Sequence, residues 1–250
     1  MRKYSNKLYC FSPPVMVATF FIEISLLAYT IYRYKMTPLT RLVAALLAFL
    51  AMFQLAEFNI CGGLLGLNAE TWSRIGYVSI SVLPPLAMHL ILVAAKASKR
   101  WQPVVALSYA MGLFWAVYFT VAPSAVEGYK CAANYAVFNL GHSMGSAYFG
   151  YYYLWLLAGI ATCIYFAKTD DRNTRIIMLL QLTGYLTFLL PTAIANTVRP
   201  ETIRAIPSIM CGFAVIYALI LVFHMVPRFK AAKTAPRPVS RQRRAVRHKM

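Results

Sequence analysis

Residues 71–96 read TWSRIGYVSISVLPPLAMHLILVAAK, and this stretch decides the fold. The run from 75 to 95 has no formal charge and, at about 1.5 Å per residue, is long enough to cross a hydrocarbon core roughly 30 Å thick. Pro84 and Pro85 at mid-span lack backbone donors, so the carbonyl groups they free must find partners on neighbouring helices, polar side chains or water. The stretch is therefore predicted to be a transmembrane helix and the most buried of its bundle.

Composition predicts an integral membrane protein. Of 250 residues, 60% are hydrophobic and only 13% are charged, and the mean hydropathy is +0.59, which excludes an ordinary soluble domain. The sequence predicts an all-α bundle of seven transmembrane helices, at 15–34, 42–60, 75–95, 104–121, 147–166, 176–196 and 206–226. Residues 1–13 form a short lead, 14–226 the membrane domain, and 227–250 a basic tail that we expect to be disordered.

Lysine and arginine are distributed unevenly between the connections. The connections after spans one, three and five carry three each and the tail carries nine, whereas the lead and the other connections carry seven in total. Because positive charge is retained on the cytoplasmic side, this distribution predicts an outer N-terminus and a cytoplasmic C-terminus. The net charge of +18 therefore follows from topology, and no nucleic acid is needed as a partner to explain it.

The tail carries no acidic residue. Its basic residues are predicted to contact anionic lipid headgroups, at about 1 kcal/mol for each one near the surface. A docking peptide for a protein partner and a simple topology determinant are the alternatives. The residues concerned include Arg241, Arg243, Arg244 and Arg247.

Two carboxyl groups lie inside predicted spans. Glu23 is near the middle of span one, and Glu57 is in span two close to Gln54. A charge at bilayer depth costs about 2.5 to 3.5 kcal/mol, so an intramembrane carboxyl indicates a functional site. No lysine or arginine lies deep in any span to pair with them. The structural alternative is that each carboxyl is protonated or paired and ties two helices together.

His89 is the one histidine well inside a span. Its charge changes near neutral pH, which suits a proton relay or a ligand contact, whereas the structural alternative is a packed residue with one hydrogen bond. The four histidines lie in four separate parts of the chain. Zinc needs three or four converging ligands, so we expect no metal and no cofactor.

The connection at 123–146 contains KCAANYAVFNLG, whose short alternation predicts a small hairpin or a lid. Cys131 in this connection could form a disulfide with Cys61 or Cys10, since all three face outward by the charge count. Spacing alone does not supply the required geometry. Cys163 and Cys211 lie in spans and are predicted to be packing residues.

The runs TWSRIGYVSISVLPPLAMHL and FQLAEFNIC, together with the aromatic fifth span, carry a resemblance to a known family. They resemble the seven-transmembrane N-terminal sensor region of bacterial membrane histidine kinases and related signalling proteins, over about residues 14–226. The resemblance implies a sensing module of the bacterial cytoplasmic membrane. In that family the region precedes a kinase or another output domain, whereas here 24 residues follow it, so we expect output through a protein partner.

These observations predict a receptor-like sensor that binds a small ligand among spans one, two, three and six, in a cavity lined by Glu23, Gln54, Glu57 and His89. Pro84, Pro85 and Pro191 are expected to mark bends that open it. The alternatives are a small proton- or ion-coupled transporter and a structural subunit of a membrane complex. An enzyme is not expected, because no span contains an aspartate and no HExxH motif occurs.

Overall fold

The computed structural model describes residues 13–62, 66–97, 99–131, 136–140, 142–198 and 205–229. Seven of its helices are long and apolar enough to cross a membrane, so the chain is a multi-pass membrane protein. They are α1 (Pro13–Arg33), α2 (Pro38–Gly62), α3 (Ala69–Ala94), α4 (Gln102–Val121), α5 (His142–Ala167), α6 (Arg172–Val198) and α7 (Ile206–Ile220), which continues into the π-helical segment η4 (Leu221–Met225). The prediction of seven helices of membrane-spanning length and apolarity is confirmed.

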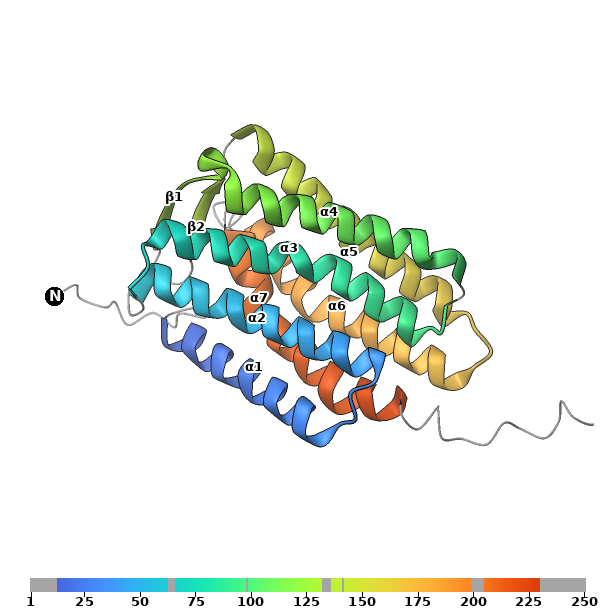
Figure 1. The fold of residues 1–250 in the computed structure, drawn as a ribbon. Helices are drawn as coiled ribbons and strands as arrows, with labels where there is room; N and C mark the ends of the chain where they lie inside the picture. Colours follow the sequence, from blue (N-terminus) through green and yellow to red (C-terminus); the bar gives the residue numbers. More distant parts are fainter. Residues whose placement is uncertain are drawn as a thin grey trace, which may run out of the picture.

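Consecutive helices run in opposite directions along the bundle (Figure 1). The C-terminal ends of α1, α3, α5 and the last helix therefore lie at one end, and their N-terminal ends lie at the other. Sequential neighbours pack together from α1 to α4 and from α5 to α7, and α3 also packs against α5. A contact between α1 and α7 closes the remaining side of the bundle.

The helix α3 is the most buried of the seven, as predicted. In its most apolar stretch 78% of the residues are buried, compared with 67% in α2, 61% in the last helix and 28% in α1. Asn68 caps its N-terminus by accepting a 2.8 Å hydrogen bond from the backbone N–H of Thr71. The Ser79 hydroxyl, which is buried, donates to the Ile75 carbonyl of its own helix at 2.8 Å. Polar side chains of α3 are therefore satisfied inside the protein.

The proline pair does not interrupt α3, which runs as one helix through Pro84 and Pro85. Pro85 cannot donate to the Ser81 carbonyl four residues before it. The Tyr151 hydroxyl of α5 donates a 2.7 Å hydrogen bond to that carbonyl instead. The expectation that a neighbouring helix partners a freed carbonyl is confirmed here.

Close approach of α4 to this point depends on Gly112. A Cβ atom at this position would lie 2.8 Å from the Pro85 Cγ and 3.2 Å from both the Ser81 carbonyl oxygen and the Tyr151 hydroxyl. Only a residue without a side chain therefore lets α4 pack directly over the proline pair.

The guanidinium of Arg74 on α3 caps the C-terminal end of α4. It donates to the carbonyls of Phe119, Ala122 and Pro123 at 3.0, 2.8 and 3.0 Å. It also forms an ion pair with Glu70, one turn earlier in α3, at 3.0 Å. Because the last carbonyls of a helix have no partners within the helix, Arg74 acts as a cap supplied by the neighbouring helix.

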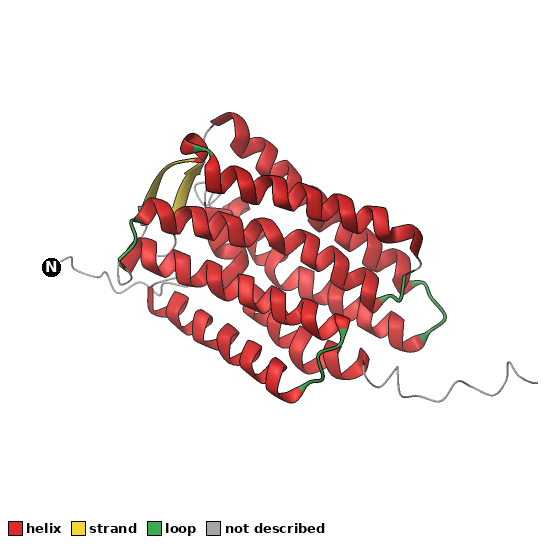
Figure 2. Ribbon diagram, viewed as in Figure 1, coloured by secondary structure: helices red, strands yellow, loops and turns green. Residues whose placement is uncertain are grey.

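A two-stranded antiparallel hairpin, β1 (Val126–Cys131) and β2 (Ala136–Leu140), lies between α4 and α5 at the end of the bundle where α3 begins (Figure 2). In its register Lys130 is opposite Val137, and Cys131 is opposite Ala136. The hairpin predicted for this connection is confirmed, and its strands contact α2 and α3.

Some predictions fall outside the described residues. Cys10 and the tail residues Arg241, Arg243, Arg244 and Arg247 lie there, as do the side chains of Cys61 and Cys131, so the proposed disulfide and the lipid contact stay predictions. Cys163 and Cys211 are free and buried, which confirms them as packing residues.

Candidate functional site

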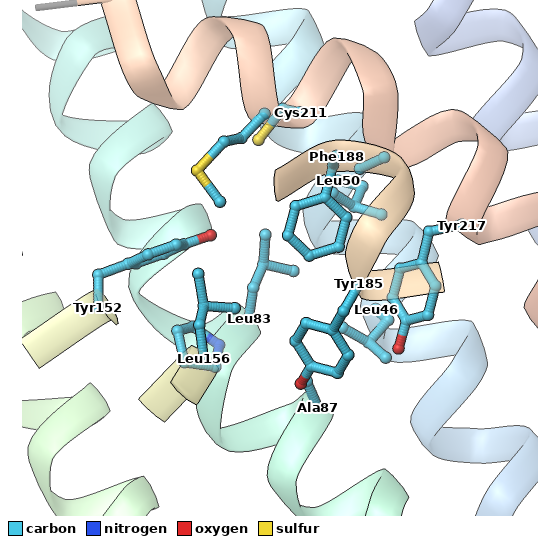
Figure 3. A pocket seen from close by; sticks show the side chains of 13 residues that line it. Leu46, Leu50, Leu83, Ala87, Tyr152, Leu156, Tyr185, Phe188, Cys211 and Tyr217 are labelled. Atoms are coloured by element: carbon cyan, nitrogen blue, oxygen red, sulfur yellow. The ribbon is translucent and has the colours of Figure 1, made fainter. Parts of the chain in front are cut away.

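A cavity of about 40 Å³ lies inside the bundle, where α2, α3, α5, α6 and α7 meet (Figure 3). In the same measure one water molecule needs about 10 to 15 Å³, so the cavity has room for a small organic group. Most of its lining side chains are apolar or aromatic. They are Leu46, Leu50, Leu83, Pro84, Ala87, Tyr152, Leu156, Tyr185, Phe188, Met210, Cys211, Ala214 and Tyr217.

Small residues form part of the cavity wall. Ala87 on α3 and Ala214 on α7 contribute only a methyl group each to a wall that also contains rings such as that of Phe188 on α6. Packed interiors have few voids larger than a water molecule, so a space of this size at the meeting point of five helices is a marked feature of the bundle. A larger side chain at either alanine would fill it.

Tyrosine supplies the main polar groups of the cavity. The Tyr152 hydroxyl points from α5 toward the open centre (Figure 3), and in the described part of the chain it has no hydrogen-bond partner. The Tyr217 hydroxyl, by contrast, accepts a hydrogen bond from the Gln181 side-chain amide. The Tyr185 hydroxyl also interacts with the Gln181 side chain. Tyr152 is therefore the tyrosine whose hydroxyl is directed at the open centre (Figure 3).

A pair of buried carboxyl groups lies nearby, between α1, α2 and α7. Glu23 and Glu57 are 0% and 1% exposed and interact electrostatically with each other. Among the described residues, both carboxyl oxygens of Glu23 and Oε1 of Glu57 have no hydrogen-bond partner. Ser208 of α7 lies beside Glu57, but its hydroxyl makes no hydrogen bond of ordinary geometry. Buried polar atoms without partners are rare in proteins, so this cluster requires an explanation.

Cys211 interacts with both the cavity and the carboxyl pair. Its side chain lines the cavity (Figure 3) and also interacts electrostatically with Glu57 and Glu23. It lies three residues after Ser208 on α7, which places both on neighbouring parts of one helix face. Cys211 is thus a residue of α7 that both lines the cavity and interacts with the carboxyl pair.

The four polar residues predicted to line one cavity do not all lie together in the structure. Glu23 and Glu57 come together, and Gln54 is buried one turn before Glu57 with its amide nitrogen unpartnered. His89 lies apart from them on the side of α4, where its Nδ1 is 3.2 Å from the Tyr109 hydroxyl. The two rings also pack edge to face at a centroid distance of 5.8 Å. This geometry matches the structural alternative for His89.

The described cavity also differs in position from the predicted one. We expected it among spans one, two, three and six, but α5 and α7 line it and α1 does not. The physical reason is that α1 packs on the outside of the bundle, whereas α7 is largely buried. Of the residues predicted for the site, only Pro84 lines this cavity. Pro85 faces Gly112, and Pro191 is half-buried within α6, which runs through it as one helix.

Sequence reasoning missed the tyrosines and Cys211. The aromatic run at 151–153 is visible in the sequence, but nothing in it indicates which ring faces the centre. Cys211 is surrounded in the sequence by apolar residues and carries no motif. Their role becomes visible only when α5 and α7 are placed opposite each other.

No family model matches the chain, and no curated protein matches it either. The resemblance to the sensor region of histidine kinases therefore stays a prediction. Among the described residues, no group of three or more His, Cys, Asp or Glu is placed to hold a metal ion. The geometry of the cavity and of the carboxyl pair is the basis for a functional proposal.

Proposed function

We propose that the chain is a receptor-like membrane sensor that binds a small ligand in the cavity between α2, α3, α5, α6 and α7. The observation that carries the proposal is the cavity itself, since five helices contribute to its wall. A ligand that fits one arrangement of these helices better than another shifts the population toward that arrangement. Such a shift is the physical event that a sensor passes on.

The lining residues define the chemistry of the ligand. Its body is apolar, because leucines, alanines and aromatic rings make up most of the wall. It carries one group that forms a hydrogen bond with the Tyr152 hydroxyl, the polar group that faces the centre (Figure 3). A strongly charged ligand is disfavoured, since no charged side chain lines the cavity.

Two helices of the wall contain proline in their interior, α3 at Pro84 and Pro85 and α6 at Pro191. Proline removes a hydrogen bond from the helix ladder, so these are the points at which a helix bends most easily. In the proposal, bending at these points accompanies ligand binding.

The proposed orientation places the C-terminal ends of α1, α3, α5 and the last helix in the cytoplasm, within a bacterial cytoplasmic membrane. Support comes from the basic residues at this end, which include Arg33, Lys96, Lys168 and Arg228. The Nζ of Lys96 lies 3.6 Å from the Asp171 carboxylate, which joins the connections after α3 and α5. A protein partner that receives the signal would bind at this end.

The proposal can be tested by identifying small molecules that copurify with the protein. Mass spectrometry of solvent extracts should find one compound in the wild type, less of it in Tyr152→Phe and little in Ala214→Leu, which fills the cavity. Tyr153→Phe is the matched control, because Tyr153 does not line the cavity. Equal amounts in all four well-folded proteins, or no specific compound in any, would contradict the proposal. Accumulation of the compound inside sealed vesicles would instead identify a carrier.

A further inference from the structure

The second feature, the carboxyl pair, has no role in the proposed binding of an apolar ligand. Four buried oxygen atoms there have no hydrogen-bond partner within the described ranges, two from Glu23, one from Glu57 and one from Ser208. Ser208 is 1% exposed and faces the Glu57 carboxyl. The cluster thus combines the carboxyl groups of Glu23 and Glu57 with the buried Ser208 hydroxyl, which comes from another helix and is directed at Glu57.

In the part of the chain that the structure describes, no positive side chain balances these groups. On α1, α2, α3 and α7, the titratable groups that interact with the pair are Tyr77 and Cys211, which are neutral in their ordinary forms. In the described part of the chain, no lysine, arginine or histidine interacts with either carboxyl. An uncompensated carboxylate in a low-dielectric interior is very costly, and two adjacent ones are more so. Among the described residues no cation does this, so a proton or a bound cation is the candidate that balances the pair.

We propose that Glu23, Glu57 and Ser208 form a binding site for a small monovalent cation, which is either an exchangeable proton or a sodium ion. Both would reduce the charge of the pair, and both are bound by oxygen atoms. A hard cation such as sodium suits a ligand set made only of carboxyl and hydroxyl oxygens. Softer metals favour imidazole or thiolate ligands, and Cys211 is the thiol that interacts with this cluster.

The site is independent of the cavity ligand but adjacent to it. Cys211 contacts the cavity and interacts with both carboxyls, so a change in the charge of the cluster reaches the cavity wall through α7. Because the two sites use different residues, a variant that cannot bind the cation still has the apolar cavity, and a variant with a filled cavity still has the carboxyl pair. The two proposals can therefore fail separately.

The experiment is thermal unfolding of the full-length protein in detergent, with sodium chloride replaced by choline chloride at constant ionic strength and constant pH. If sodium binds, the Tm of the wild type should rise by about 3 to 6 °C for each tenfold increase in sodium above its dissociation constant. Glu57→Gln, Glu23→Gln and Ser208→Ala should each remove this dependence. Asp170→Asn is the matched control, because Asp170 is exposed and should leave the sodium effect unchanged.

A second arm tests the proton in sodium-free buffer by infrared spectroscopy. If a proton is bound, the wild type should show the carbonyl band of a protonated carboxyl, which changes as pH rises and is altered in Glu57→Gln or Glu23→Gln. Asp170→Asn should leave this band unchanged. A Tm independent of sodium, combined with no pH-dependent carboxyl band from these two residues, would overturn the proposal. A sodium effect that persists in all three site variants would overturn it as well.

Discussion

The Tyr151 hydroxyl on α5 donates a 2.7 Å hydrogen bond to the Ser81 carbonyl on α3, across 70 residues of sequence. That carbonyl has lost its helical partner because Pro85 has no N–H. Tyr152, the next residue, faces the cavity, and so does Pro84, the residue before Pro85. The bond therefore fixes α5 against α3 directly beside the cavity.

Tyr151→Phe removes this donor and leaves a buried carbonyl without a partner. We expect the free energy of unfolding to fall by about 1 to 2 kcal/mol, measured by reversible unfolding in detergent. In a Pro85→Ala background the same change should cost less, because residue 85 then supplies its own N–H. An equal cost of Tyr151→Phe in both backgrounds would contradict this account of the bond.

Gly112→Ala should be destabilising, because the new Cβ would lie 2.8 Å from the Pro85 Cγ. Overpacking of this kind costs about 1 to 3 kcal/mol. Gly150→Ala is the control, since a Cβ there meets nothing within 4 Å and alanine favours a helix. Thermal unfolding should show a lower Tm for the first variant and an unchanged or higher Tm for the second. The reverse order would show that α4 does not pack over the proline pair as described.

Arg74→Lys should lower the thermal stability, because a lysine ammonium lacks the planar fork that contacts three carbonyls at the end of α4. We expect a loss of about 1.5 to 3 kcal/mol, as for hydrogen bonds to charged groups. Glu70→Gln tests the ion pair alone and should cost less than about 1 kcal/mol, since the Glu70 side chain is 57% exposed. If Arg74→Lys and Glu70→Gln lower the stability equally, the hydrogen bonds from Arg74 to the end of α4 do not explain the effect of Arg74→Lys.

Asp171 caps the N-terminus of α6. Its carboxylate accepts a 2.6 Å hydrogen bond from the Thr174 hydroxyl, and this bond, with weaker help from Lys96, holds the pKa of Asp171 below its usual range. Asp171→Ala should cost about 1 kcal/mol, whereas Asp170→Ala, its exposed neighbour, should cost almost nothing.

The cost of Asp171→Ala should also depend on pH. A carboxyl with a lowered pKa contributes stability that is fully present above its ordinary pKa and is lost as pH falls through the lowered value. The Tm difference between wild type and Asp171→Ala should therefore be full at neutral pH and shrink in acid. The effect is modest because the Asp171 side chain is 48% exposed. A difference that grows in acid would contradict the assigned bonding.

The helices could be predicted from the sequence because apolar length is a local property. The same holds for the burial of α3, since Pro84 and Pro85 oblige freed carbonyls to find partners. The identity of one partner, Tyr151, could not be predicted, because it depends on how α5 is rotated against α3. Several tyrosines lie close together in α5, and the sequence gives no means of choosing among them.

The candidate site was predicted only in part. Glu23 and Glu57 are conspicuous because charge is rare in a span, and the structure places them together. The cavity escaped prediction because its wall consists of ordinary apolar residues, such as Ala214, that are chemically no different from lipid-facing ones. A cavity depends on how the helices pack against one another, and the hydropathy of the sequence does not predict that packing.

A density map of the purified protein at side-chain resolution would show directly whether the cavity between Tyr152 and Cys211 holds a ligand. We predict density for a small, mostly apolar molecule in the cavity, within hydrogen-bond distance of the Tyr152 hydroxyl. A cavity closed by the side chains of α5 and α7, or one containing no bound molecule, would contradict a ligand-binding sensor.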